Sequence, residues 1–232
     1  MILPTFSETA DEAMSVARRA EEVGIDGVFC YDHLWPMGQP DRPALAPFPV
    51  LAAVAATTQR ISVGTLVARI GLVPDEVLVT EFETLDALAP GRVVAGLGTG
   101  DRLSADENRA YGISFRPADE RVEALRRCAR ALRARSIAVW VGGASRKTMA
   151  VAEEEQVVAN LWDAPEAAVA DQAARSEVTW AGPPPTFSDA SGELASLFGR
   201  LSAAGATWAV LGWPVPLEAM AAAARGLTPR AD

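Results

Sequence analysis

Short apolar runs alternate with helical patterns along the whole chain, and this alternation is its main structural signal. The apolar runs are rich in Val, Ile, Leu and Phe, which is typical of strands buried on both faces. They predict strands over 2–6, 27–31, 61–67, 92–97, 138–141, 157–161, 178–180 and 207–211. Apolar residues at helical spacing predict helices over 13–23, 50–57, 75–88, 118–133, 145–154, 165–175, 193–204 and 217–224.

This order of elements predicts an α/β protein with parallel strands. About eight strand–helix units favour a (β/α)₈ TIM barrel, formed as one compact domain over residues 1–232. An open, doubly wound sheet has the same pattern and remains the structural alternative. At the first helix, Thr9 and Glu12 have the spacing of a capping box. The polar segment 98–117 interrupts the alternation, and no helix is expected near its start.

Composition narrows the possible partners. Half of the 232 residues are apolar, which is enough for a packed core, and 30 acidic against 21 basic residues give a net charge of −9. That charge would repel nucleic acid and anionic membrane surfaces. No apolar run is long enough to span a bilayer, and no secretion signal is visible. Cys30 and Cys128 form neither a disulfide framework nor a metal-ligand cluster, so we expect a cytoplasmic protein without a metal.

In a TIM barrel, ligand chemistry lies at the carboxyl ends of the strands. One such end carries His33, the single histidine, between Asp32 and a Pro-rich loop that begins near Trp35. An imidazole titrates near neutral pH, so His33 is suited to proton transfer or to binding a cofactor. Asp32 would orient His33 or cap the loop. Because adjacent residues of a strand point to opposite faces, a direct pair between the two is not expected.

Glycines mark two further strand ends. Gly98, Thr99 and Gly100 precede Asp101, and we interpret these glycines as backbone clearance for a flat ligand beside the Asp101 carboxylate or a turn that it caps. A Rossmann fingerprint is a poor match, because its third glycine would fall on Asp101. The turn Gly142-Gly143-Ala144-Ser145 leads into a predicted helix. It is either an ordinary tight turn or a phosphate site built from free helix amides.

The remaining conspicuous residues have simpler interpretations. The arginines between 121 and 135 predict a solvated helix face. Most tryptophans lie in or near strands and are expected in the core or at the rim, whereas Trp35 lies in a loop and could cover a ligand ring.

Several stretches, taken in their order and spacing, resemble the bacterial luciferase-like flavin monooxygenase superfamily. They are similar in particular to its branch that uses the deazaflavin coenzyme F420 in place of FMN. The matching stretches are 24–29 with Asp32-His33, 60–65, 84–86 with 91–93, 96–100, Glu107-Asn108 with 111–113, and 139–143. The resemblance covers residues 20–165 well.

The resemblance implies a TIM barrel with the cofactor ring against the second to fourth strands. It implies catalytic roles for His33, Trp35 and Asp101, the last in place of a proton-donating Glu. It implies that the cofactor is contacted by Asp32, Thr65, Leu66, Val67, Gly98, Thr99 and Gly100, and by the phosphate-binding turn Gly142, Gly143, Ala144 and Ser145. At the position of Leu66-Val67 many relatives have a non-prolyl cis peptide. The chain departs from typical members in being shorter, in lacking a late insertion, and in having Tyr31 where a Ser is usual.

The resemblance implies a cytoplasmic F420-dependent oxidoreductase that transfers a hydride between a small organic substrate and the deazaflavin. Members of the family are often dimers, so the resemblance also suggests a homodimer. Three alternatives stay open. An FMN-dependent luciferase-like monooxygenase would use His33 to stabilise a flavin peroxide. A non-catalytic protein would bind flavin or F420. A barrel lyase or isomerase would bind a phosphorylated substrate at Gly142-Gly143.

Overall fold

The structure is a computed structural model that describes residues 1–143, 145–186 and 189–227. Within these ranges the strands are β1 (Gly27–Cys30), β2 (Ser62–Thr65), β3 (Ala68–Arg69), β4 (Val93–Gly98), β5 (Ala138–Gly142), β6 (Val158–Trp162), β7 (Val178–Gly182) and β8 (Ala206–Leu211). The helices are α1 (Asp11–Val23), α2 (Pro47–Thr57), α3 (Asp75–Leu88), α4 (Arg102–Ala110), α5 (Ala118–Arg133), α6 (Arg146–Glu154), α7 (Glu166–Ala173), α8 (Ala190–Ala204) and α9 (Leu217–Arg225).

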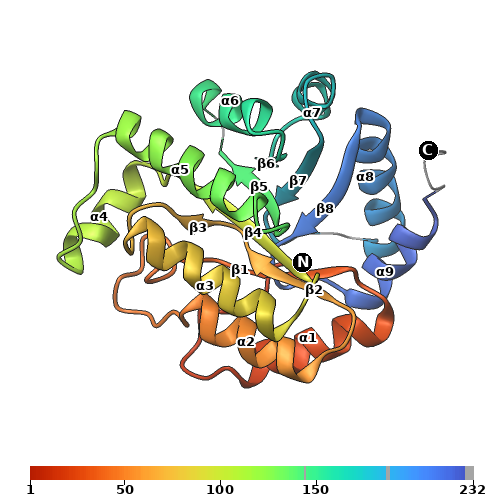
Figure 1. Cartoon of the computed structure of the whole chain (residues 1–232). Coiled ribbons are helices and arrows are strands. Elements are labelled where there is room, and N and C mark those ends of the chain that lie inside the picture. The colour runs from red at the N-terminus through yellow and green to blue at the C-terminus, as the bar shows by residue number, and fades with distance from the viewer. Residues whose placement is uncertain (144, 187–188, 228–232) are drawn as a thin grey trace.

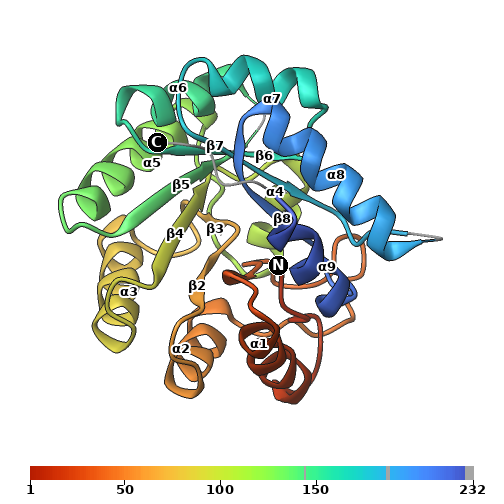
Figure 2. The same cartoon turned by 90° about the vertical axis from the view of Figure 1, so that its right-hand side faces the viewer.

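The strands form one curled parallel sheet in the order β1-β2-β4-β5-β6-β7-β8, with the short β3 paired to β4. Helices surround the outside of this sheet (Figures 1 and 2). The first residues of the chain lie at both of its edges. The amide of Ile2 donates to the carbonyl of Leu211 in β8 (2.8 Å), and the amide of Leu3 donates to the carbonyl of Phe29 in β1 (2.7 Å).

Two apolar clusters follow from the alternation of side chains along each strand. In β1, Val28 and Cys30 point outward into the large cluster beneath the helices. Phe29, between them, points inward and joins a smaller cluster inside the curl of the sheet. There its ring stacks on that of Trp140, with centroids 5.1 Å apart. The inner cluster fills the space inside the sheet below the carboxyl ends of the strands, and it supports the residues at those ends.

The predicted parallel α/β architecture is confirmed, but three local predictions are wrong. The segment near position 100 opens helix α4, which Asp101 caps together with Ser104. Helix α1 has Ala10 at its N-cap and no side-chain cap, so Thr9 and Glu12 form no capping box. Of the expected first strand, 2–6, only the bridge between Ile2 and Phe29 forms.

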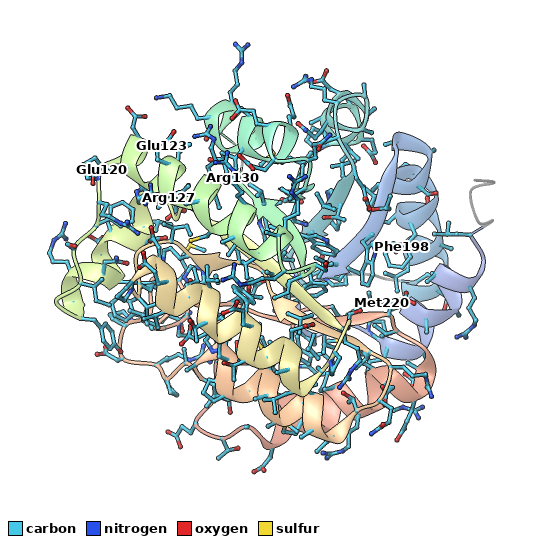
Figure 3. The ribbon with its side chains drawn as sticks, viewed as in Figure 1. Glu120, Glu123, Arg127, Arg130, Phe198 and Met220 are labelled. Atoms are coloured by element: carbon cyan, nitrogen blue, oxygen red, sulfur yellow. The ribbon has the colours of Figure 1, made fainter. Side chains whose placement is uncertain are left out.

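The surface of α5 confirms the predicted arginine face only in part. Arg127 and Arg130 lie on its outer side (Figure 3) and form ion pairs with Asp75 of α3 and Glu155, respectively. Arg121 instead turns inward. Its Nη1 donates to the carbonyls of Thr99 and Gly100 after β4, and its guanidinium lies 4.0 Å from the ring centroid of Phe115. One residue of this face therefore holds a loop at the strand ends.

A cavity of about 500 Å³ lies at the amino-terminal end of the strands, where Gly27 begins β1 and Ala206 begins β8. Phe198 of α8 and Met220 of α9 line it (Figure 3). It is at the opposite end of the sheet from the residues that the sequence selects. In the described ranges, no helix is long and apolar enough to cross a membrane.

Candidate active site at the strand ends

A cavity of about 610 Å³ opens at the carboxyl ends of the strands. That volume is in the range of pockets that bind small molecules and cofactors. The residues that line it come from the segment before α1, the end of β1 and the loop after it, the segment from β2 through β3, the ends of β4, β5 and β6, and the first turns of α4 and α6. They are Phe6, Tyr31, Asp32, His33, Met37, Leu66, Val67, Arg69, Gly98, Thr99, Gly100, Asp101, Ser104, Gly142, Gly143, Ser145, Thr148, Asn160 and Trp162.

His33 forms an ion pair with a buried carboxylate at the wall of this cavity. Its Nδ1 lies 2.7 Å from Oε1 of Glu107, a residue of α4. Burial disfavours charge on both groups, but their mutual attraction outweighs it. The pKa of His33 is therefore raised above its usual 6.5, and the pKa of Glu107 is lowered to about 2. With Nδ1 engaged by Glu107, Nε2 is the imidazole nitrogen left to act on a ligand.

Arg69 joins this pair to Asp32. Its Nη2 donates to Oε2 of Glu107 at 2.8 Å, and its backbone amide donates to Oδ2 of Asp32. All three side chains are almost fully buried. Burial raises the pKa of Asp32, and the charge of Arg69 works against that rise. As the sequence indicates, Asp32 and His33 do not bind each other directly. They are linked through Arg69 and Glu107.

The floor of the cavity is built by Leu66 and Val67, whose connecting peptide is cis, as the resemblance implies. The side chain of Val67 occupies the space above Gly98 and Gly142, which are paired neighbours in β4 and β5. A Cβ at Gly98 would lie 2.4 Å from Cγ2 of Val67, and one at Gly142 would lie 2.6 Å from its Cγ1. These glycines therefore make room for Val67 rather than for a ligand directly, and the apolar surface offered to a flat ligand is Leu66-Val67.

The turn after β5 leads into the N-terminus of α6 at one side of the cavity. Ser145 is the N-cap, and its Oγ accepts from the backbone amide of Thr148 at 3.0 Å. Gly143 has φ 153°, and a Cβ there would lie 3.0 Å from Cγ2 of Thr148, so the backbone remains bare at this point. Free amides and the positive end of a helix dipole suit a phosphate group here.

The cavity brings together most of the site residues that the sequence selects. His33, Asp32, Asp101, Leu66, Val67, Gly98, Thr99, Gly100, Gly142, Gly143 and Ser145 line it. Thr65 lies beneath the floor, fully buried, where its hydroxyl donates to the carbonyl of Gly96 at 2.7 Å. Trp35 does not line the cavity; it is 9% exposed and stacks on Tyr111. Ala144 is outside the residues that the structure describes.

Asp101 has a different environment from that of a proton donor. Its Oδ1 accepts from the amide and the hydroxyl of Ser104, and the Oγ of Ser104 accepts in turn from the backbone amide of Asp101, which completes the capping box of α4. Burial raises the pKa of Asp101, but these hydrogen bonds outweigh it, and the net shift is downward. The carboxylate is thus ionised and structurally engaged, whereas a general acid needs a raised pKa.

The sequence-selected residues omit the charged groups Arg69, Glu107 and Arg121, which hold the site together. They also omit several residues that line the cavity: Phe6, Tyr31, Met37, Ser104, Thr148, Asn160 and Trp162. The signal for Glu107 is present in the sequence as the polar residues Ser104, Glu107 and Asn108, spaced three and four apart. All three are buried in α4. A buried polar helix face of this kind indicates a hydrogen-bond network. Arg69 follows the cis peptide, and no local pattern in the sequence distinguishes it from a surface arginine.

Residues 2–186 match the family model of the luciferase-like monooxygenases. Among curated proteins, an F420-dependent glucose-6-phosphate dehydrogenase from Kineococcus radiotolerans is 36% identical over 118 residues, which are 50% of this chain and 34% of that protein. The corresponding enzyme from Nakamurella multipartita is 44% identical over 100 residues, which are 42% of this chain and 28% of that protein. The chain thus spans about a third of these relatives.

Among solved structures, an F420-dependent secondary alcohol dehydrogenase in complex with an F420-acetone adduct superposes with a TM-score of 0.78. The match covers 94% of this chain and 95% of that one, at 14% sequence identity. At that identity the likeness establishes a shared fold.

Proposed function

Because the chain belongs to the luciferase-like monooxygenase family, we propose that it is an F420-dependent oxidoreductase that transfers a hydride between a small organic substrate and the deazaflavin. The observation that carries this proposal is the His33–Glu107 pair at the wall of a cavity whose floor is apolar and whose side is a helix N-terminus. The curated relatives, which are named as F420-dependent enzymes, favour the deazaflavin over FMN.

The residues of the cavity fit the parts of such a cofactor. Leu66 and Val67 offer an apolar surface to a flat ring, because Gly98 and Gly142 leave room for Val67 to lie between the strands. The bare backbone at Gly143 and the N-terminus of α6 suit a phosphate. When bound there, a deazaflavin supplies hydride chemistry to the site.

We assign the proton that accompanies hydride transfer to Nε2 of His33. Glu107 holds the Nδ1 side of the ring and stabilises its protonated form, and Arg69 keeps Glu107 ionised and fixed. The attraction of Glu107 raises the pKa of the imidazole and so favours its protonated form, which is the form that can donate a proton. His33 is thus the catalytic residue, and Glu107 and Arg69 are positioning residues.

We further propose that the sheet closes into a (β/α)₈ barrel that forms one domain over the chain. The support is the pair of hydrogen bonds by which residues Ile2 and Leu3 reach β8 and β1. A closed barrel leaves no unpaired edge, and it fixes the strand ends on which the site is built.

The test is titration of the purified protein with oxidised F420 and, separately, with FMN, followed by cofactor fluorescence and calorimetry. We expect saturable binding of F420 and weaker binding of FMN. Tighter binding of FMN would contradict the deazaflavin proposal and favour the FMN-dependent monooxygenase. Binding of neither cofactor would contradict both.

Catalysis is separated from simple cofactor binding by His33→Ala. We expect this variant to retain F420 binding and to lose about 100-fold or more in turnover, the low end of what general acid–base catalysis contributes. Arg18→Ala, an exposed residue of α1, is the matched control. Unchanged turnover in His33→Ala would mean that the imidazole moves no proton.

A further inference from the structure

Besides the Leu66-Val67 floor, the lining of the cavity includes the aromatic residues Phe6, Tyr31 and Trp162, which we call the aromatic wall. Tyr31 is at its centre, just after β1. Its ring is stacked on Phe6, with centroids 5.8 Å apart and planes inclined by 13°, and it meets the ring of Trp162 edge-on at 6.1 Å. The imidazole of His33 lies 6.0 Å from the same ring. The rings of Phe6 and Tyr31 thus lie beside the imidazole to which we assign proton transfer, and Trp162 extends the aromatic surface on the other side of Tyr31.

Two large apolar side chains that line the cavity here are exposed to solvent. Trp162, at the end of β6, is 47% exposed, and Met37 is 58% exposed. The indole has no hydrogen-bond partner within the described part of the chain, and its one ring contact is with Tyr31. Large apolar side chains left uncovered at the mouth of a cavity are typical of a surface that a ligand covers.

The charge of the wall selects against an anionic ligand. Among the described side chains that line the cavity, Arg69 and His33 are the ones that can be positive, and both are bound to Glu107. Asp32 and Asp101 add negative charge nearby. The helix N-terminus suited to a phosphate is the one assigned above to the cofactor. A phosphate on the substrate would therefore lie beside carboxylates and aromatic rings and would find no unpaired cation among the described side chains of the wall. Its binding would be electrostatically unfavourable.

We propose that this aromatic wall, Phe6, Tyr31 and Trp162, makes the site specific for an uncharged substrate that carries a ring next to its reacting carbon, in contrast to the phosphate ester named for the curated relatives. The inference rests on the proposed function, because the wall becomes a substrate site once F420 covers the floor. Trp162 is its main determinant, since a ring of the substrate would cover the exposed indole.

The test measures binding, with oxidised F420 present throughout so that a ketone forms a complex without turnover. Three probes separate ring from charge: acetophenone has a ring and no charge, acetone lacks the ring, and phenyl phosphate keeps the ring and adds negative charge. We expect acetophenone to bind at least tenfold more tightly than either of the others by calorimetry. Equal affinity for acetone, or tighter binding of phenyl phosphate, would overturn the proposal.

The role of Trp162 is tested by two substitutions. Trp162→Ala should weaken acetophenone binding about three- to tenfold, the equivalent of one lost aromatic contact, and should leave acetone unaffected. Trp162→Phe should restore most of that binding. Loss of acetophenone binding that Phe does not restore, or no loss in Trp162→Ala, contradicts the assignment.

Intrinsic fluorescence supplies a second readout. Acetophenone should quench the emission of Trp162, so quenching should disappear in Trp162→Phe and persist in Trp213→Phe, which alters an indole bound to Glu12 outside the cavity. F420 affinity is measured for every variant. If the wild-type protein fails to bind F420, the proposed function fails. If it binds F420 and prefers acetone or phenyl phosphate, only the substrate inference fails.

Discussion

The Nδ1 atom of His33 lies 2.7 Å from Oε1 of Glu107, although 74 residues separate them in the sequence. The contact joins the end of a strand, β1, to a short helix, α4, that begins after β4. It fixes the orientation of the single imidazole of the protein and raises its pKa. Because there is one histidine, its titration can be followed without interference from any other imidazole.

Glu107→Gln should lower the pKa of His33. The amide keeps a hydrogen-bond acceptor beside Nδ1 but removes the negative charge that favours the imidazolium, while burial continues to disfavour it. The imidazole resonances in NMR, followed against pH, give the pKa directly. Glu166→Gln, an exposed residue that pairs with Arg200, is the control and should leave the His33 titration unchanged. An unaltered His33 pKa in Glu107→Gln would mean that the negative charge of Glu107 does not stabilise the imidazolium.

The same pair predicts a pH window for stability. The lowered pKa of Glu107 makes its contribution fully present above its ordinary value of 4.5 and lost as pH falls toward about 2. The raised pKa of His33 makes its contribution fully present below its ordinary value of 6.5 and lost as pH rises through the raised value. The difference in unfolding free energy between the wild-type protein and Glu107→Gln should therefore be largest between pH 4.5 and 6.5. On the alkaline side part of the difference remains, because Arg69 still pairs with Glu107. Urea denaturation at a series of pH values checks this, and a difference that rises steadily with pH would contradict it.

Arg69→Met should be strongly destabilising. It removes the buried cation that compensates Glu107 and donates to it, and the loss of one partner of a buried pair typically costs about 3–5 kcal/mol. Urea denaturation measures the change. The control is Arg127→Met, which removes the ion pair between Asp75 and a largely exposed arginine. It should lower the unfolding free energy far less. A similar loss in both variants would show that the buried network adds nothing special to stability.

The alternation of strands and helices made the architecture predictable, because burial on both faces of a parallel sheet leaves continuous apolar runs. Helix α5 has the predicted bounds, Ala118–Arg133. The helix α4 was not predictable in this way, since its buried face carries Ser104 and Glu107 and so lacks apolar periodicity. Apolar periodicity reports contacts with a core, whereas α4 packs through polar contacts with Arg69 and His33.

The strand ends were predictable as the place of the site for a similar reason, since polar residues and glycines gather where buried strands stop. The functions of individual glycines were not. Gly98 was interpreted as clearance for a ligand, whereas it makes room for Val67, whose Cγ2 would lie 2.4 Å from a Cβ at this position. For Asp101 the sequence left a ligand-side carboxylate and a capping residue as alternatives, and the structure shows the capping role, at the start of the unpredicted helix α4.

The packing of Val67 over Gly98 gives a prediction that a double-mutant cycle can test. In Gly98→Ala the new Cβ would lie 2.4 Å from Cγ2 of Val67, so the floor of the cavity must shift. Overpacking of this kind costs roughly 1–3 kcal/mol and should also weaken F420 binding. Val67→Ala removes the colliding methyl groups, so the double variant should recover part of both losses relative to Gly98→Ala. The control is Gly199→Ala in α8, where a Cβ meets nothing within 4 Å. It should stabilise the protein by about 0.5–1 kcal/mol, because Ala has a higher helix propensity than Gly.

Urea denaturation of the two single variants and the double variant measures the coupling. Additive changes in unfolding free energy for Gly98→Ala and Val67→Ala would show that the two residues do not share the floor of the site.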